Sequence, residues 1–132
     1  MELLALESIV TTQLKTRITR QLGSLYPNLS FTSEVSEKTP SFPNVYVHEL
    51  EPSEVGMSIP NQTIHAIRDT IQIDVSTNTS KADARKVANA VVNTMKLLQY
   101  TIVAMPTYIK DNNLHRYVIR ARRVIANGDT FN

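Results

Sequence analysis

The side chains best suited to chemistry in this 132-residue chain are three histidines and a pair of glutamates. His48, His65 and His115 fall in three different predicted strands or strand ends. No HExxH pattern joins them, so their spacing predicts neither a metal site nor a catalytic site. Glu49 and Glu51 alternate along one predicted strand and share a face. Two carboxylates so placed could perform acid–base chemistry, but they also fit a solvated strand face.

The composition removes several other kinds of site. The chain has no cysteine, which excludes disulfide frameworks, cysteine zinc sites, iron–sulfur clusters and thiol nucleophiles. No GxSxG motif is present, and three glycines leave little material for a phosphate-binding loop. The sequence therefore predicts no catalytic, cofactor-binding or metal-binding residues, and we expect no enzymatic activity.

Charge is distributed unevenly, although the formal net charge is only +2. Residues 34–54 hold five glutamates against one lysine, a local net charge of −4, and residues 110–123 have a local net charge of +4. Three arginines of the basic segment share one face of a predicted strand with Val118. The candidate interface or DNA-channel residues are Arg116, Arg120, Arg122, Glu49, Glu51 and Glu54.

Three interpretations of these charges remain open. In the first, the strands are neighbours and their charges pair across the sheet within one subunit. In the second, the acidic and basic surfaces meet between subunits, in a head-to-tail contact that can close into a ring. In the third, the arginine face meets nucleic-acid phosphate, without exposed aromatic residues to read bases.

The elements that position these residues follow from hydrophobic periodicity. At 132 residues the chain is long enough for one domain with a real core. It has no apolar run long enough to span a bilayer, and its first residues do not have the pattern of a secretory signal. The expected order is α-β-β-β-α-β-β. The first helix is expected at 2–22. The second opens at Ser80-Lys81-Ala82-Asp83, with Ser80 as N-cap, and carries an apolar stripe from Ala84 to Leu98. The strands are expected at 29–37, 45–50, 64–76, 100–105 and 114–126.

This order predicts an α+β fold with a mainly antiparallel mixed sheet of four to five strands and two helices packed on one face. In the 64–76 strand the apolar face is interrupted by Asp69 near the loop end. The strand is long, so a hairpin is expected to project from the sheet. In the loop at 52–62, Val55, Met57 and Ile59 either contact a partner or fold back on the domain.

Several segments together resemble the small tail-completion proteins of long-tailed bacteriophages, the tail terminators and head–tail joining proteins. They are the Phe42-Pro43-Asn44-Val45-Tyr46-Val47 entry to the second strand, the acidic Glu49-Leu50-Glu51 run, the Thr70–Val75 strand and the Ala82–Met95 helix. The resemblance covers about residues 1–126 and implies one tail-terminator-like domain over residues 1–132.

The resemblance implies a structural protein that forms a ring, hexameric in this group, at the head-proximal end of the tail tube. Such a ring ends tail growth and joins tail to head. The implied partners are further copies of the chain, the tail tube protein, a head-completion or neck protein, and DNA passing through without sequence specificity, with no membrane. The implied location is the virion, assembled in the host bacterial cytoplasm. Another neck component and a small nucleic-acid-binding module remain the alternatives.

Overall fold

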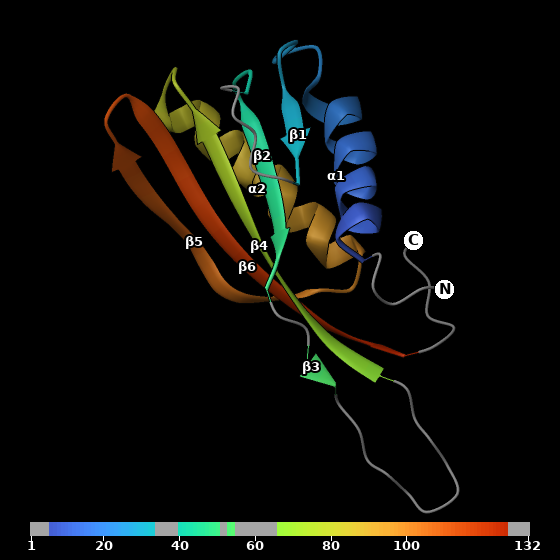
Figure 1. The fold of residues 1–132 in the computed structure, drawn as a ribbon. Coiled ribbons are helices and arrows are strands. Elements are labelled where there is room, and N and C mark those ends of the chain that lie inside the picture. The colour runs from blue at the N-terminus through green and yellow to red at the C-terminus, as the bar shows by residue number, and fades with distance from the viewer. Residues whose placement is uncertain (1–5, 34–39, 51–52, 55–65, 127–132) are drawn as a thin grey trace, which may run out of the picture.

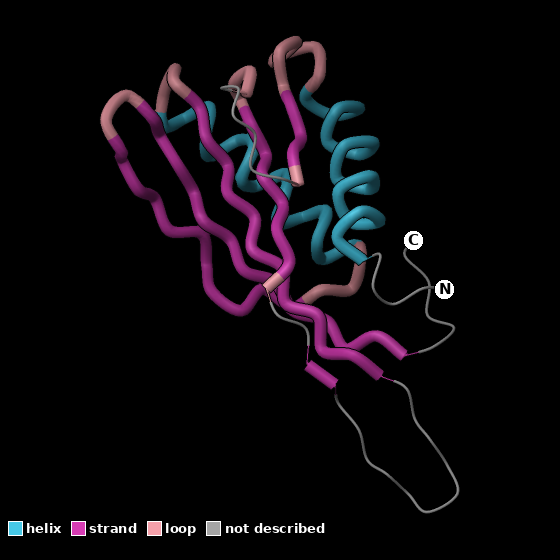
Figure 2. Tube along the Cα trace, in the orientation of Figure 1, coloured by secondary structure: helices cyan, strands magenta, loops and turns pink. Residues whose placement is uncertain are grey.

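The computed structural model describes residues 6–33, 40–50, 53–54 and 66–126 (Figures 1 and 2). A sheet is covered on one face by two helices (Figure 1). The elements in chain order are α1 (Leu6–Leu22), β1 (Ser30–Thr32), β2 (Asn44–Glu49), β3 (Ser53–Glu54), β4 (Ala66–Thr77), α2 (Lys81–Leu97), β5 (Thr101–Asp111) and β6 (Leu114–Ala126).

The sheet has the strand order β1-β2-β4-β6-β5, and the two-residue β3 pairs with β4. Only the β1–β2 pairing is parallel. The predicted α+β class, with a mostly antiparallel mixed sheet and two helices, is therefore confirmed. β3 is an addition to the expected order, in the segment that the sequence assigned to a loop.

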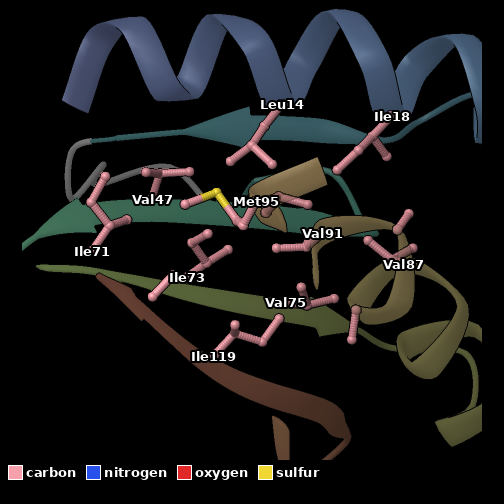
Figure 3. Close-up of a cluster of buried hydrophobic side chains, with 14 of the residues drawn as sticks. Leu14, Ile18, Val47, Ile71, Ile73, Val75, Val87, Val91, Met95 and Ile119 are labelled. Carbon is pink, nitrogen blue, oxygen red and sulfur yellow. The ribbon is translucent and has the colours of Figure 1, made fainter. Parts of the chain in front are cut away.

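The core lies between the sheet and the helices, where the apolar side chains of the helices pack against those of the strands (Figure 3). In α1 the predicted apolar face is correct, since Val10, Leu14 and Ile18 are fully buried. In the central strands β4 and β6 alternate residues are buried along most of their length, as the period of two requires. Each buried Val, Leu or Ile side chain contributes about 1.5–3 kcal/mol. The buried strand residues are Val45, Val47, Ile71, Ile73, Val75, Tyr117, Ile119, Ala121 and Ile125.

Both ends of α2 are defined by local hydrogen bonds. At the start, the Ser80 hydroxyl accepts a bond from the Asp83 N–H at 3.1 Å, which confirms the predicted N-cap. At the other end Gln99 adopts a φ of 68°. Its N–H donates to Lys96 O and the Tyr100 N–H donates to Met95 O, which is the pairing of a Schellman motif. The turn brings the chain directly into β5.

Two predicted strands have different lengths in the structure. The strand expected at 100–105 runs from Thr101 to Asp111. It lies at the edge of the sheet, so its residues are mostly exposed and their alternation is too weak to predict the full length. The strand expected at 29–37 is limited to Ser30–Thr32 among the described residues, and 34–39 lie outside them.

The start of β4 and the end of β6 continue beyond the helices as a narrow ribbon, which we call the arm (Figure 1). The two strands stay paired as far as Ala66 and Ala126. On the other side of β4, Ser53 of β3 lies opposite Arg68. The expected projecting hairpin ran from residue 44 to residue 76; of it the structure describes the pairing of β2 and β3 with β4, and the tip at 55–65 lies outside the described residues. The predicted contact residues Val55, Met57 and Ile59 lie outside the described residues.

Candidate functional site

The face of the sheet away from the helices carries the predicted arginines. Odd-numbered residues of β4 and β6 are buried under the helices, so the even-numbered residues point to the other side. On β6 these are Arg116, Arg120 and Arg122, as the sequence predicted. We call this surface the open face. No helix of the described chain covers it (Figure 1).

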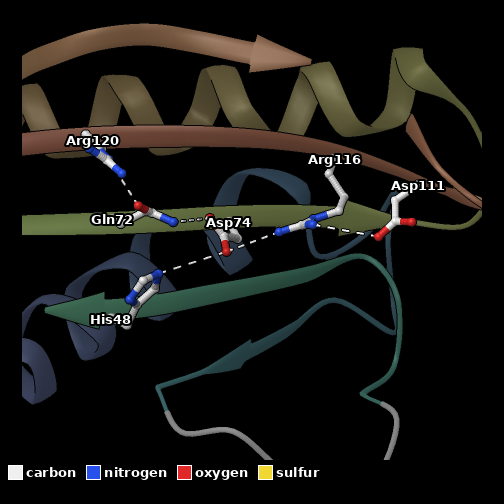
Figure 4. A network of polar contacts seen from close by, with 6 residues as sticks. All are labelled: His48, Gln72, Asp74, Asp111, Arg116 and Arg120. Carbon is white, nitrogen blue, oxygen red and sulfur yellow. Dashed lines mark hydrogen bonds and ion pairs between the residues drawn. The ribbon is translucent and has the colours of Figure 1, made fainter. Parts of the chain in front are cut away.

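Asp74 of β4 is the centre of a polar network on the open face (Figure 4). Its Oδ2 lies 3.4 Å from Nη2 of Arg116 and 4.0 Å from Nε2 of His48. Its Oδ1 accepts a 3.2 Å hydrogen bond from Gln72, and the Gln72 side-chain oxygen accepts a 3.0 Å bond from Arg120. Arg116 also lies 3.9 Å from Asp111. Ion pairs so open to solvent contribute at most about 1 kcal/mol each, so the network orients the arginines more than it stabilises the fold.

The glutamates predicted to face these arginines are placed elsewhere. Glu49 lies opposite Ile71 in the β2–β4 register, and because Ile71 is buried, Glu49 belongs to the helix side of the sheet. β4 also separates β2 from β6. Within one chain, the acidic partners of Arg116 are therefore Asp74 and Asp111. Glu54 lies in β3 opposite Ile67, and Glu51 lies outside the described residues.

A buried polar cluster at the base of the arm was missed by the sequence reasoning. Asp69 is fully buried, and its Oδ2 accepts a 2.7 Å hydrogen bond from the hydroxyl of Tyr100. Arg123 lies opposite Asp69 in the β4–β6 register and donates to Leu98 O at 3.0 Å. Burial and the bond to Asp69 hold the pKa of Tyr100 well above its usual range, and the nearby charges of Asp69 and Glu49 add to the effect.

A sequence signal for this cluster does exist. Asp69 interrupts the apolar face of β4, and Arg123 interrupts the apolar face of β6 two residues before Ile125. Two charges of opposite sign, each on an otherwise apolar strand face, indicate that the two positions are neighbours. Asp69 alone reads as a break in an apolar face, and its pairing with Arg123 becomes visible only when both strands are considered together.

A second cluster joins the two helical regions at the other end of the sheet. The Asp83 carboxylate accepts hydrogen bonds from Thr79 at 2.6 Å and from the hydroxyl of Tyr26 at 2.9 Å. These bonds hold the pKa of Asp83 below its usual value, while burial and the contact with Asp83 raise the pKa of Tyr26. The hydrogen bonds of this cluster connect the turn after α1 with the start of α2.

The histidines do not converge. His48 belongs to the open-face network, His115 bonds to the hydroxyl of Tyr108 at 2.7 Å, and His65 lies outside the described residues. The described residues contain no group of three or more His, Asp and Glu side chains placed to bind a metal ion. None of the described helices is long and apolar enough to cross a membrane.

Known proteins resemble this chain in fold but not in sequence. The sequence matches no protein-family model and no characterised protein. The structure is similar to a chain of a solved structure described as the virion of the native gene transfer agent (GTA) particle. The TM-score is 0.53 at 15% sequence identity, over 89% of this chain and 92% of that chain. The two chains share their α+β fold over nearly their whole lengths.

Proposed function

We propose that this chain is a non-enzymatic structural subunit of a phage-like particle. It forms a ring of six copies at the head-proximal end of the tail tube, ends tail growth and joins the tail to the head. The observation that carries this proposal is the near-complete match in fold to a chain of the GTA virion. The resemblance of the sequence segments to tail-completion proteins supports the same function independently of the coordinates.

The placement of charge supports a head-to-tail assembly. Arg120 and Arg122 are exposed on the open face. On the other side of β4, Glu54 lies in β3. β3 and the basic strand β6 are therefore separated by β4. Such a separation suits a heterologous contact, in which a surface of one copy meets a different surface of the next.

The partners in this proposal are further copies of the chain, the tail tube protein and a head-completion or neck protein. DNA would pass through the ring without sequence-specific contacts. Val55, Met57 and Ile59 would supply the loop that contacts another virion protein. The chain would be assembled in the host bacterial cytoplasm and remain in the neck of the virion, with no cofactor.

The experiment is size-exclusion chromatography with light scattering, followed by negative-stain microscopy. We expect particles of six copies of the 14.8 kDa chain and images with six-fold symmetry. The double variant Arg120→Glu/Arg122→Glu should lose the ring. Arg85→Glu, which reverses an exposed charge on α2, should keep it. A chain that stays monomeric at all concentrations, including in the presence of tail tubes, would contradict the proposal.

The exposed arginines of the open face also favour a second candidate function, a small nucleic-acid-binding module. Binding through phosphates alone would weaken steeply as salt rises, with a slope set by the number of phosphates contacted. Tight DNA binding by the monomer, lost in the Arg120→Glu/Arg122→Glu variant, would favour this function over the ring.

A further inference from the structure

The outer surface of the two helices is basic. α1 and α2 pack beside each other on one face of the sheet, and their outer sides point away from it (Figure 1). Among their described side chains, six cations are exposed and no carboxylate is exposed. The one acidic side chain described there, Asp83, is half-buried and already accepts hydrogen bonds from Thr79 and Tyr26. The exposed cations are Lys15, Arg20, Lys81, Arg85, Lys86 and Lys96.

On α2, three of these cations and two exposed amides form a row, which we call the basic stripe. Its members recur at steps of four or three residues, so they lie along one side of the helix. At a rise of 1.5 Å per residue the stripe is about 22 Å long, which matches about six base pairs of B-DNA. The members are Lys81, Arg85, Asn89, Asn93 and Lys96.

The charges of the basic stripe are not neutralised by neighbouring carboxylates. Arg85 and Lys96 form no ion pair with any described residue. Nζ of Lys81 lies 4.5 Å from the centre of the Tyr108 ring, a contact that leaves its charge in place. On the open face, by contrast, Arg116 lies within ion-pair distance of two aspartates. A polyanion therefore meets less competition from the chain's own carboxylates on α2 than beside Arg116.

The residue types of the basic stripe favour nucleic acid over an acidic protein as the partner. Protein interfaces are built around aromatic or large apolar side chains that become buried. The stripe contains none, and the exposed large apolar residue of α2, Leu97, lies in its last turn. Ammonium, guanidinium and carboxamide groups all donate hydrogen bonds to phosphate oxygens. The stripe thus offers what a phosphate backbone accepts and lacks what a protein interface needs.

We propose that the basic stripe binds the phosphate backbone of double-stranded DNA, with Arg85 and Lys96 in direct contact with phosphates. Binding is independent of base sequence, because contacts to phosphates alone carry no sequence information. The proposal rests on the proposed function, in which DNA passes through the ring, and specifies the surface that the DNA meets. The open face is then left for contacts between copies of the chain.

The test is the affinity of the full chain for a short fluorescent DNA duplex, measured by anisotropy at several salt concentrations. Arg85→Gln/Lys96→Gln removes two cations and keeps side chains that favour a helix. Two lost phosphate contacts should lower the slope of log affinity against log salt by about 1.8. Between about 1 M and 0.1 M salt this corresponds to a roughly 60-fold loss of affinity.

Arg68→Gln/Lys110→Gln is the matched control, because it removes the same charge from exposed residues outside the helices. It should weaken binding less than about threefold, since neither residue belongs to the stripe. Equal losses in the two variants would mean that only net charge matters and would overturn the proposal. Poly-glutamate that binds as tightly as a duplex of equal charge would assign the stripe to an acidic protein and also overturn it.

Light scattering on the same samples separates this proposal from the proposed ring. The Arg85→Gln/Lys96→Gln variant should still form rings. Rings of the parent chain that bind no duplex would overturn the stripe as a DNA surface and leave the ring intact. A parent chain that stays monomeric and binds the duplex through Arg85 and Lys96 would overturn the ring and keep the stripe. Thermal unfolding of each variant confirms that folded proteins are being compared.

Discussion

Replacing Tyr100 with Phe removes one hydroxyl from the buried cluster at the base of the arm. That hydroxyl donates a 2.7 Å hydrogen bond to Oδ2 of Asp69, which is fully buried. The other oxygen of Asp69 is buried without a hydrogen-bond partner among the described residues. Because Phe keeps the ring, apolar burial is almost unchanged. The substitution therefore isolates the loss of one donor to a buried carboxyl group.

The expected cost at pH 7 is about 2–3 kcal/mol of unfolding free energy, since hydrogen bonds to charged groups contribute about 1.5–3 kcal/mol and the acceptor is left unsatisfied. For a chain of this size the melting temperature should fall by roughly 6–10 °C. The assay is urea unfolding followed by circular dichroism. Tyr46→Phe is the matched control, because Tyr46 is half-buried on the open face; it should cost less than about 0.5 kcal/mol.

The pH dependence gives a second readout. The folded chain holds the Tyr100 proton above the usual pKa, because burial and Asp69 disfavour the phenolate. The unfolded chain releases that proton near pH 10. The stabilisation is therefore complete below about pH 10 and is lost above it, at about 1.4 kcal/mol per pH unit. Tyr100→Phe lacks this proton, so the difference between the two proteins should shrink above pH 10 and vanish near pH 11.5–12.

Two results would refute this reasoning. A Tyr100→Phe variant as stable as the parent at pH 7 would mean that the Asp69 carboxyl group finds another donor or is solvated. A difference that stays constant from pH 9 to pH 11.5 would mean that Tyr100 ionises alike in the folded and unfolded chains.

Three smaller changes test the local features that frame the site. Gln99→Gly should stabilise the protein by about 0.5–1 kcal/mol in urea unfolding. Glycine adopts the observed φ of 68° without the steric strain that a glutamine side chain causes there. A loss of stability would contradict the Schellman assignment. Ser80→Ala should lower the free energy of unfolding by about 1 kcal/mol, because the N-cap is lost. Ser80→Asp can also cap the helix and should stay within about 0.5 kcal/mol of the parent protein. Equal losses in the two variants would argue against capping. Arg116→Gln should cost less than about 1 kcal/mol, and the cost should shrink as salt rises, because its pair with Asp74 is partly exposed and therefore screened. A loss above about 2 kcal/mol would show that the open-face network supports the fold.

The sequence predicted the fold well in those elements whose apolar residues recur at a regular period and pack into the buried core. The boundaries of β6 were predicted to the residue, and the apolar face of α2 is buried almost throughout. Its start at Ser80 was recognised because N-capping is a local interaction between residues three apart. The length of β5 was underestimated, because an edge strand pairs on one side only and its residues are mostly exposed, so their alternation is weak.

The candidate site was predicted in part, for a related reason. The shared face of Arg116, Arg120 and Arg122 follows from the strand period alone. The contact of Arg116 with Asp74 does not, because Asp74 comes beside Arg116 only through the pairing of β4 with β6, more than forty residues apart in the chain. Assigning Glu49 to one face of the sheet was harder still. Glu49 and the arginines both looked like surface residues, and only the register with buried Ile71 places Glu49 on the helix side.

The buried cluster at the base of the arm determines where β5 starts. Arg123 faces the core, where its bond to Leu98 O attaches β6 to the turn after α2. Tyr100, the next residue but one after Leu98, is anchored to Asp69 on β4. β5 begins one residue later, so both anchors hold its first residue, Thr101, opposite Arg122 of β6. A polar group buried at a cost in stability is understandable at this place, because it sets the register in which the edge strand begins.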